Sequence, residues 1–292
     1  MATWNPSVLL LIPAYNEEAR IRPVLRDYAA YFRARYPGKF QLVVVLNGCR
    51  DTTLSVVESV AAEFPEISAR EHAAPIGKGG ALIEGLKLSP LADVVGYVDA
   101  DGATAPAAFH DLIKLCADYD CVIASRWIKG ALVKQEQPSH RKFISRAGHL
   151  VIKTLFPRLK IIDTQCGAKV MRRAAIEQIH SSLRITDMAF DINLLYCLKR
   201  AGFRIHEHPT EWTDKSGSKV ALGKMSLSAL LSVARLRLVY SPFYWLRPLL
   251  RPLEVWLYQK LSAPPPITGR DRDPAGRVQD SRRQPSRPSN PR

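Results

Sequence analysis

The stretch that decides the fold is Val94-Val95-Gly96-Tyr97-Val98-Asp99-Ala100-Asp101. Its first five residues carry no charge, which is typical of a strand buried on both faces of a parallel sheet. Comparable apolar runs occupy residues 7–14 and 40–46, and a weaker one occupies residues 67–71. Helical spacing of apolar residues separates these runs. This alternation predicts an α/β fold with a doubly wound, mostly parallel sheet covered by helices on both faces.

Polar residues follow three of the four predicted strands. Asn16-Glu17 follows the first strand, Asn47 and Asp51 follow the second, and Asp99 and Asp101 end the fourth. In open parallel sheets, ligands bind outside the carboxyl ends of the strands. We therefore expect the functional site at this edge of the sheet.

The pair Asp99 and Asp101, beside Gly102, predicts a divalent-metal site for a diphosphate. Mg²⁺ and Mn²⁺ prefer oxygen ligands and share their shell with water and substrate phosphates. A solvated turn is the alternative, because Asp and Gly are common in turns. The patterns of dinucleotide-binding and P-loop proteins are absent, since the turn Gly77-Lys78-Gly79-Gly80 has a different spacing. A dehydrogenase or P-loop enzyme is therefore disfavoured.

The composition indicates a folded, basic protein. The 292 residues include 42 Lys and Arg against 27 Asp and Glu, a formal net charge of +15, so anionic partners are expected. Nucleic acid, an anionic membrane surface and a phosphorylated substrate all satisfy that condition. Five scattered cysteines argue against a disulfide framework or zinc ribbon and favour a reducing compartment.

Composition also divides the chain. Residues 1–225 form the expected α/β domain, and residues 263–292 form a Pro- and Arg-rich tail that is too polar to fold. Seven Arg against three Asp give this tail +4, which leaves +11 for residues 1–262. The composition of residues 226–262 predicts an amphipathic, aromatic-rich helical segment that lies on a membrane surface. The alternative is a pair of helices that pack on the domain. The tail is either an electrostatic tether to lipid or RNA, or dispensable.

No targeting or spanning segment is expected. The apolar run at residues 8–12 is short and lacks a basic region before it, so no signal peptide is predicted. No uninterrupted apolar stretch reaches about 18 residues, so no transmembrane helix is predicted. These observations favour a cytoplasmic protein that is peripheral on the cytoplasmic face of a membrane.

Several motifs occur in an order that resembles family 2 inverting glycosyltransferases of the GT-A fold. The resemblance covers about residues 7–240 and is closest to dolichyl-phosphate β-glucosyltransferases, with dolichol-phosphate mannose synthases as near relatives. The motifs are Ile12-Pro13-Ala14-Tyr15-Asn16-Glu17, Asn47-Gly48-Cys49-Arg50-Asp51, Gly77-Lys78-Gly79, Asp99-Ala100-Asp101, Ser125-Arg126, Asp163-Thr164-Gln165-Cys166-Gly167-Ala168-Lys169, Phe190-Asp191 and Gly217-Ser218-Lys219.

This resemblance implies a role for each matching residue. Asp99 and Asp101 would bind Mg²⁺ or Mn²⁺ and the diphosphate, and Asp191 would be the third catalytic carboxylate, either as a base or to orient the acceptor. A loop on the acceptor side would include Gln165, Gly167 and Lys219. The nucleotide-sugar site would comprise Pro13, Tyr15, Glu17, Asn47, Asp51, Lys78 and Asp99.

The acceptor is expected to be a polyprenyl phosphate. Arg141 and Ser145 share a face if residues 141–149 are helical, and Arg pairs well with phosphate. Relatives that use this acceptor have comparable residues, so Arg126, Arg141 and Ser145 are our candidate phosphate clamp. A solvated basic helix face is the alternative. Cys166 is interpreted as packing rather than as a nucleophile, because the inverting reaction needs no covalent intermediate.

Two departures from the family pattern bear on the donor. Leu46-Asn47 stands where members often carry two acidic residues, and Ala103 stands where mannose synthases place Gln. The second departure favours UDP-glucose, with GDP-mannose next. One alternative is a family 2 enzyme acting on a glycan or a small hydroxylated acceptor. Another is a basic nucleic-acid- or membrane-binding protein without catalysis. Nucleic acid is the weakest option, because residues 1–220 show no binding motif and no basic groove with stacking aromatics.

Overall fold

The computed structural model describes residues 4–133, 150–213 and 222–241, together with the single residues Trp245, Leu249, Pro252 and Trp256. The side chains of residues 222–230 are not described. Four parts of the expected site and domain division lie outside the described residues: Arg141, Ser145, Lys219 and the tail at residues 263–292.

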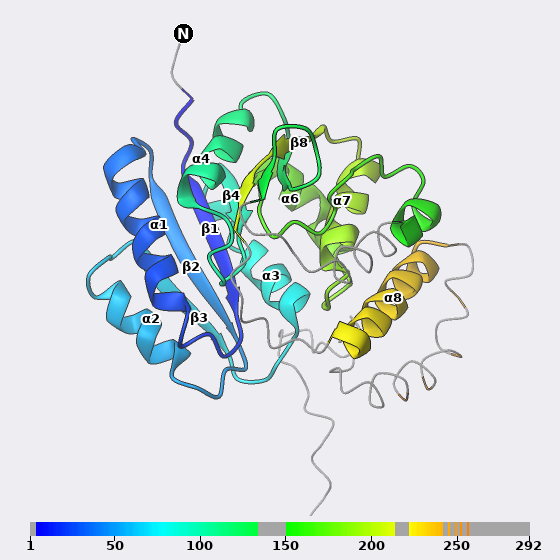
Figure 1. Cartoon of the computed structure of the whole chain (residues 1–292), viewed down its shortest axis with the longest axis horizontal. Helices are drawn as coiled ribbons and strands as arrows, with labels where there is room; N and C mark the ends of the chain where they lie inside the picture. Colours follow the sequence, from blue (N-terminus) through cyan, green and yellow to red (C-terminus); the bar gives the residue numbers. More distant parts are fainter. Residues whose placement is uncertain are drawn as a thin grey trace, which may run out of the picture.

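A seven-stranded sheet forms the centre of the molecule (Figure 1). Its strand order is β3-β2-β1-β4-β7-β5-β8, and β7 is antiparallel to both of its neighbours while the other pairings are parallel. The mostly parallel α/β sheet expected from the sequence is therefore confirmed. The strands are β1 (Val8–Ala14), β2 (Phe40–Asn47), β3 (Ile67–His72), β4 (Val94–Tyr97), β5 (Cys121–Ser125), β7 (Lys169–Arg172) and β8 (Ile205–Pro209).

Helices cover both faces of this sheet. The helices named in the figures are α1 (Ile21–Arg35), α2 (Thr53–Ala61), α3 (Lys78–Leu86), α4 (Pro106–Leu115), α6 (Arg173–Ile179), α7 (Phe190–Arg200) and α8 (Leu222–Val239).

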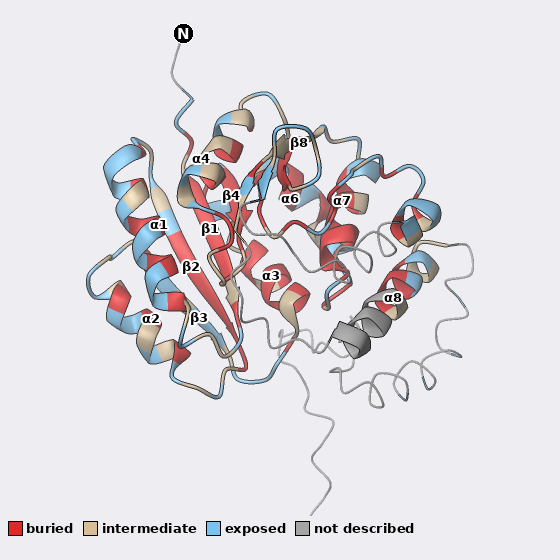
Figure 2. Cartoon of the chain, viewed as in Figure 1, coloured by how far each residue is buried: buried red, intermediate tan, exposed pale blue. Residues whose placement is uncertain are grey.

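The core has two layers because neighbouring residues of a strand point to opposite faces. Leu9 and Leu11 of β1 pack in a cluster with α3, α6, α7 and α8, whereas Leu10 and Ile12 pack with α1, α2 and α4. Figure 2 shows the buried residues along the central strands and on the inner sides of the helices. Near-continuous burial of β1 explains why its sequence is apolar without alternation.

The carboxyl ends of the central strands meet at one edge. In the parallel registers, Ala14 of β1 lies opposite Leu46 of β2, and Leu11 lies opposite Tyr97 of β4. The chain crosses from β1 towards β2 and β3 on one side, and β4 lies on the other side of β1. The strand order therefore changes direction between β1 and β4. In open α/β sheets, ligands bind at the carboxyl ends of the strands at such a switch point.

Two features add to this framework. β6 (Leu132–Val133) pairs with β9 (Glu211–Trp212) in a small second sheet, and Thr104 forms a bridge to Trp212. The domain boundary expected at residue 226 falls inside α8, whose Val233 and Leu236 are buried in the core cluster with α7. Within the described residues, no helix is both long and apolar enough to cross a membrane.

Candidate active site

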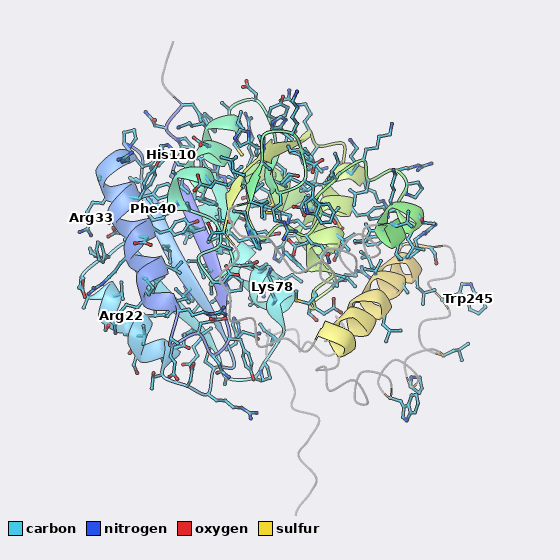
Figure 3. All side chains as sticks on the ribbon, in the orientation of Figure 1. Arg22, Arg33, Phe40, Lys78, His110 and Trp245 are labelled. Atoms are coloured by element: carbon cyan, nitrogen blue, oxygen red, sulfur yellow. The ribbon has the colours of Figure 1, made fainter. Side chains whose placement is uncertain are left out.

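A glycine turn places Lys78 at the site edge. Gly77 has φ +79°, and a Cβ there would lie 2.3 Å from the Thr186 carbonyl oxygen, so only glycine fits. Gly80 donates its N–H to the same carbonyl oxygen at 3.1 Å. The turn is thus clamped against residues 185–187, and α3 begins at Lys78 (Figure 3).

Lys78 and Asp99 form the central ion pair of the site. The ammonium Nζ lies 2.6 Å from Asp99 Oδ1, and the side chains of Lys78 and Asp99 are 22% and 39% exposed. Burial alone would lower the pKa of Lys78, but the nearby carboxylates of Asp99 and Asp191 raise it. Lys78 therefore remains a cation at neutral pH.

The backbone of Gly167 presses against the other oxygen of Asp99. A Cβ at Gly167 would lie 2.1 Å from Asp99 Oδ2. Gly167 belongs to the loop between residues 163 and 168, so the structure brings this loop and the end of β4 together. Gln165 in the same loop is exposed, whereas Cys166 is buried.

Asp101 lies beside Asp99 and is partly exposed. Its Oδ1 accepts a hydrogen bond from the Ala103 N–H at 2.9 Å. Burial and the neighbouring charge of Asp99 raise the pKa of Asp101. Two carboxylates that repel each other are stabilised by a cation placed between them.

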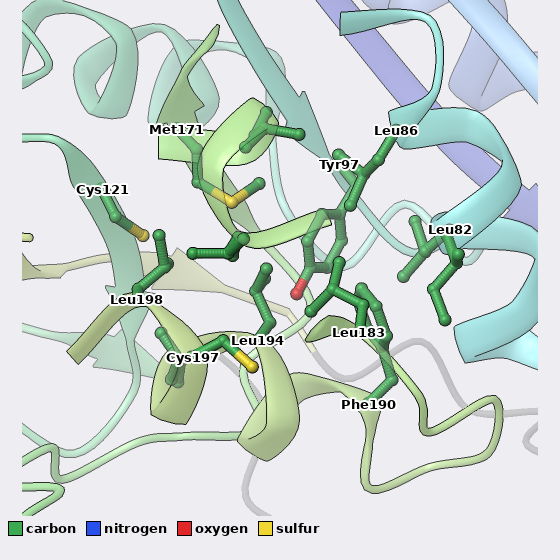
Figure 4. Packing of buried hydrophobic residues seen from close by; sticks show 14 of the residues in the cluster. Leu82, Leu86, Tyr97, Cys121, Met171, Leu183, Phe190, Leu194, Cys197 and Leu198 are labelled. Atoms are coloured by element: carbon green, nitrogen blue, oxygen red, sulfur yellow. The ribbon is translucent and has the colours of Figure 1, made fainter. Parts of the chain in front are cut away.

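Asp191 is a buried and fully ionised carboxylate. It stands in the first turn of α7, and its Oδ1 accepts hydrogen bonds from the Tyr97 hydroxyl and the Lys169 ammonium, each at 2.5 Å. Burial would raise its pKa, but Lys169 and Lys78 lower it below the usual range. The phenol of Tyr97 reaches Asp191 from within the apolar core, near Phe190 and Leu194 (Figure 4).

Lys169 is a site residue to which the sequence analysis assigned no role. Its side chain is fully buried, and Nζ also donates to the Cys166 carbonyl oxygen at 2.6 Å. An isolated buried ammonium is costly, so its pairing with Asp191 is required. The signal in the sequence is a lysine that opens the apolar run Lys169-Val170-Met171.

The residues predicted at the nucleotide side fix the loops at the strand ends. Asn47 Oδ1 accepts from the Ile76 N–H at 2.6 Å and so supports the turn before Lys78. Asp51 Oδ1 accepts from the N–H and hydroxyl of Thr53, and the bonds of Thr53 lower the pKa of Asp51 against the opposing effect of burial.

The other three nucleotide-side residues lie in or just after β1. Pro13 is the sixth residue of β1, and Tyr15 is half exposed just beyond it. Glu17 forms an ion pair with Arg20 at 2.7 Å. They lie at the same strand-end edge of the sheet as Asn47.

Arg126 follows β5 and is held by a partner that sequence reasoning missed. Its backbone N–H, Nε and a terminal nitrogen donate to the Asp163 carboxylate at 2.7–2.9 Å. The guanidinium also lies 5.4 Å from the ring centre of Trp212. Burial opposes ionisation, yet Asp163 raises the pKa of Arg126. The Arg126 guanidinium therefore stays charged at neutral pH, but one of its edges is already hydrogen-bonded to Asp163.

Cys166 does not have the properties of a nucleophile. Burial raises its pKa to about 11, with the positive charge of Arg126 only partly offsetting the effect. The thiol therefore stays protonated at neutral pH, and a protonated thiol is a poor nucleophile.

The donor set at Asp99 and Asp101 fits a divalent cation held jointly with a substrate. Within the described ranges there is no cluster of three or more His, Cys, Asp or Glu that could hold a metal ion by itself. Two carboxylates with open positions suit Mg²⁺ or Mn²⁺, which usually keep water and phosphate oxygens in their shell.

Comparisons with known proteins show which family the chain resembles. The family described as Glycosyl transferase family 2 matches residues 9–180. Glycosyltransferase AglD of Haloferax volcanii is 30% identical over 218 residues, which cover 74% of this chain but only 34% of that relative. Dolichyl-phosphate beta-glucosyltransferase ALG5A of Trichomonas vaginalis is 31% identical over 223 residues, which cover 74% of this chain and 68% of the relative.

A solved structure shares the fold. Glucosyl-3-phosphoglycerate synthase from Mycobacterium tuberculosis, determined with Mn²⁺, UDP and glucosyl-3-phosphoglycerate, superposes with a TM-score of 0.60 at 18% identity. The match covers 81% of this chain and 82% of the synthase. It extends across most of both chains and supports the GT-A assignment of the sheet and its helices.

Proposed function

The chain belongs to glycosyltransferase family 2, and we propose that it transfers a hexose from a nucleotide sugar to a polyprenyl phosphate at a membrane surface. UDP-glucose is the favoured donor and GDP-mannose the next. Transfer inverts the anomeric carbon, because the acceptor oxygen displaces the nucleoside diphosphate directly.

The observation that carries this proposal is the cluster of Lys78, Asp99 and Asp101 at the ends of β1 and β4. A leaving diphosphate gains negative charge as the sugar departs, and fixed positive charge at that point lowers the barrier. Lys78 supplies such a charge from a turn whose backbone is clamped by Thr186.

The proposed cofactor is Mg²⁺ or Mn²⁺, held by Asp101 and Asp99. When bound, such an ion supplies Lewis-acid stabilisation of the diphosphate. Pro13, Tyr15, Glu17, Asn47 and Asp51 would line the nucleoside end of the same pocket, and Asn47 and Asp51 also hold the loops that shape it.

The proposed acceptor phosphate would be held by Arg126, Arg141 and Ser145, beside a loop that includes Gln165, Gly167 and Lys219. Arg126 would offer the part of its guanidinium that Asp163 leaves open. A phosphate oxygen is largely ionised near neutral pH, so no strong base is needed. This suits Asp191, whose Oδ1 is occupied by Tyr97 and Lys169, as an orienting anion rather than a proton acceptor.

The proposed location is the cytoplasmic face of a membrane. Over residues 227–261, Arg247 and Arg251 stand near Trp245, Trp256 and Tyr258 in the sequence, a composition that suits the headgroup region. Arg235 in the same stretch is buried. Relatives named dolichyl-phosphate beta-glucosyltransferases support a lipid-phosphate acceptor.

A donor and acceptor screen tests the proposal. The full chain is incubated with labelled UDP-glucose or GDP-mannose, with Mg²⁺ or Mn²⁺, and with a short polyprenyl phosphate. We expect a mild-acid-labile glycolipid from UDP-glucose and less from GDP-mannose. Label transferred only to water-soluble glycans or small alcohols would instead favour the alternative acceptor class.

A further inference from the structure

Lys78 lies near the carboxylates of Asp99 and Asp191, which differ in how many hydrogen bonds their oxygens accept. Its Nζ is 2.6 Å from Asp99 Oδ1 and 3.9 Å from Asp191 Oδ2. Asp191 Oδ1 already accepts two hydrogen bonds, from Tyr97 and Lys169. Oδ2 accepts none from any residue that the structure describes, so it is an acceptor within short reach of the Lys78 ammonium.

The pairing with Asp99 has a consequence for any second cation. If a divalent ion binds Asp99, the ammonium and the ion compete for the same carboxylate and repel each other. Lys78 cannot simply turn into solvent, because its side chain is only 22% exposed and burial penalises an unpaired charge. The competition is relieved if the ammonium has another buried partner.

We propose that Lys78 exchanges partners: it holds Asp99 before the divalent cation binds and moves to Asp191 Oδ2 when the cation takes Asp99. This inference rests on the proposed function, because the cation site at Asp99 and Asp101 is part of it. It gives Asp191 a defined task, which is to receive an ammonium.

The starts of the two helices that carry Lys78 and Asp191 are packed against each other. Gly77 and Gly79 pack directly on residues 185–187 and on Phe190, because a Cβ at Gly79 would lie 2.6 Å from Phe190 Cβ. The start of α3, which carries Lys78, is thus tied to the start of α7, which carries Asp191.

Lys169 and Tyr97 act as positioning residues in this exchange. Both are buried, and both bind the same oxygen of Asp191, which leaves the other oxygen facing Lys78. The 3.9 Å gap to Oδ2 is about 1 Å longer than a normal charged hydrogen bond, so a small rotation of the lysine side chain closes it.

Binding of Mn²⁺ to the full chain, without nucleotide, tests the exchange. Free Mn²⁺ is measured by electron paramagnetic resonance for wild type, Lys78→Met and the control Lys87→Met. Lys87 carries the same charge at the end of α3 but pairs with Glu84 at 2.5 Å and is 47% exposed. We expect Lys78→Met to bind Mn²⁺ at least about fivefold more tightly than wild type, the factor for two unit charges about 4 Å apart in water-like screening and therefore a lower bound for a doubly charged ion. We expect Lys87→Met to match wild type.

Equal or weaker binding by Lys78→Met would overturn the exchange, as would the absence of Mn²⁺ binding in every variant. A circular dichroism spectrum checks that each variant is folded. Lys78→Gln, which keeps a polar side chain at the partly exposed position, is the second variant if Lys78→Met does not fold.

The receiving role of Asp191 is tested by the same titration in a double-variant cycle. Asp191→Asn removes a negative charge near the site and therefore weakens Mn²⁺ binding in any background. If it also removes the receiving oxygen, the weakening should be at least about threefold larger with Lys78 present than in Lys78→Met. Equal weakening in both backgrounds would contradict the exchange.

The titration separates this inference from the proposed function. Tight Mn²⁺ binding by Lys78→Met with no sugar transfer from any nucleotide sugar would leave the exchange standing and remove the function. Sugar transfer by wild type together with unchanged Mn²⁺ affinity in Lys78→Met would leave the proposed function standing and remove the exchange.

Discussion

At the scale of single residues, Gly167 controls where Asp99 can lie. Its α-carbon faces the Asp99 carboxylate so closely that a methyl group would occupy the position of Oδ2. The backbone of Gly167 is not in the left-handed region, so alanine is compatible with its conformation. The steric conflict therefore concerns the carboxylate and leaves the local chain unstrained.

We predict that Gly167→Ala keeps the fold and loses most of its activity. A displacement of about 1 Å in a group that positions substrate can reduce the rate by about 100-fold. The expected result is a kcat reduced about 100-fold with a melting temperature close to that of wild type. Wild-type kcat would show that the Asp99 carboxylate does not need its present position.

The buried pair of Lys169 and Asp191 makes a prediction about stability and pH. Removing the ammonium in Lys169→Met leaves Asp191 with fewer opposing charges in the core, which typically costs about 3–5 kcal/mol. We expect a loss in this range at pH 7, measured by urea unfolding. A loss below about 1 kcal/mol would mean that Asp191 does not depend on Lys169 for its charge.

The pH dependence of that loss has a definite sign. In wild type the pKa of Asp191 is lowered in the folded state, so its contribution is present above the unfolded pKa of about 4 and is lost as pH falls through the folded value. In Lys169→Met, only the more distant Lys78 and the Tyr97 hydroxyl still oppose the effect of burial, so we expect the pKa of Asp191 to rise and protonation to relieve part of the cost. The difference in unfolding free energy between variant and wild type should therefore shrink from pH 7 to pH 5.

Part of the candidate site could be predicted from the sequence, for a physical reason. Asp99, Asp101 and Lys78 stand at a strand end or in a glycine turn, where local pattern indicates their role. Lys169 and Asp163 were missed as functional partners because they pair with residues 22 and 37 positions away. Such pairing is decided by the folded chain and leaves no local signal.

At the scale of elements, the turn before α3 sets the position of the Lys78 ammonium. Gly77 adopts φ +79° with its α-carbon against the Thr186 carbonyl oxygen, and Gly202 adopts φ +85° with nothing within 4 Å. The two glycines thus share a positive φ and differ in what surrounds them, and Gly77 also has an extended ψ of 160°.

This difference makes Gly202→Ala a matched control for Gly77→Ala. Gly202→Ala should lose about 1–2 kcal/mol of stability from its positive φ alone. Gly77→Ala should lose about 1–3 kcal/mol, because φ +79° with ψ 160° is a region that essentially only glycine adopts. Only Gly77→Ala must also move the turn away from Thr186, so only it should weaken UDP binding, by about tenfold or more. Isothermal titration with UDP measures this, and equal UDP affinity in the two variants would show that the turn does not position the nucleotide.

The elements themselves were predicted well where the pattern is repeated. Four alternations of apolar run and amphipathic helix correspond to β1, β2, β3, β4 and the helices between them. The antiparallel insertion of β7 between β4 and β5 was not predicted, because a four-residue strand with only two apolar residues, Val170 and Met171, does not specify a partner. The pairing of β6 with β9 is equally non-local.

At the scale of the whole molecule, the positive charge of the chain divides into regions with different roles. Lys78, Lys169 and Arg126 are neutralised by Asp99, Asp191 and Asp163 inside the domain. These buried cations shape the site and contribute little to attraction at long range. The charge available to an anionic partner therefore comes from exposed residues, which agrees with a protein that meets phosphate-bearing substrates.

The central claim is that the carboxylates at the end of β4 support transfer from a nucleotide sugar. The most direct measurement compares kcat/KM for labelled UDP-glucose and polyprenyl phosphate in wild type, Asp99→Asn and Asp101→Asn, with circular dichroism as the control for folding. We expect that both variants fold and that transfer falls by about 100-fold or more in each. Wild-type transfer by either folded variant would contradict it.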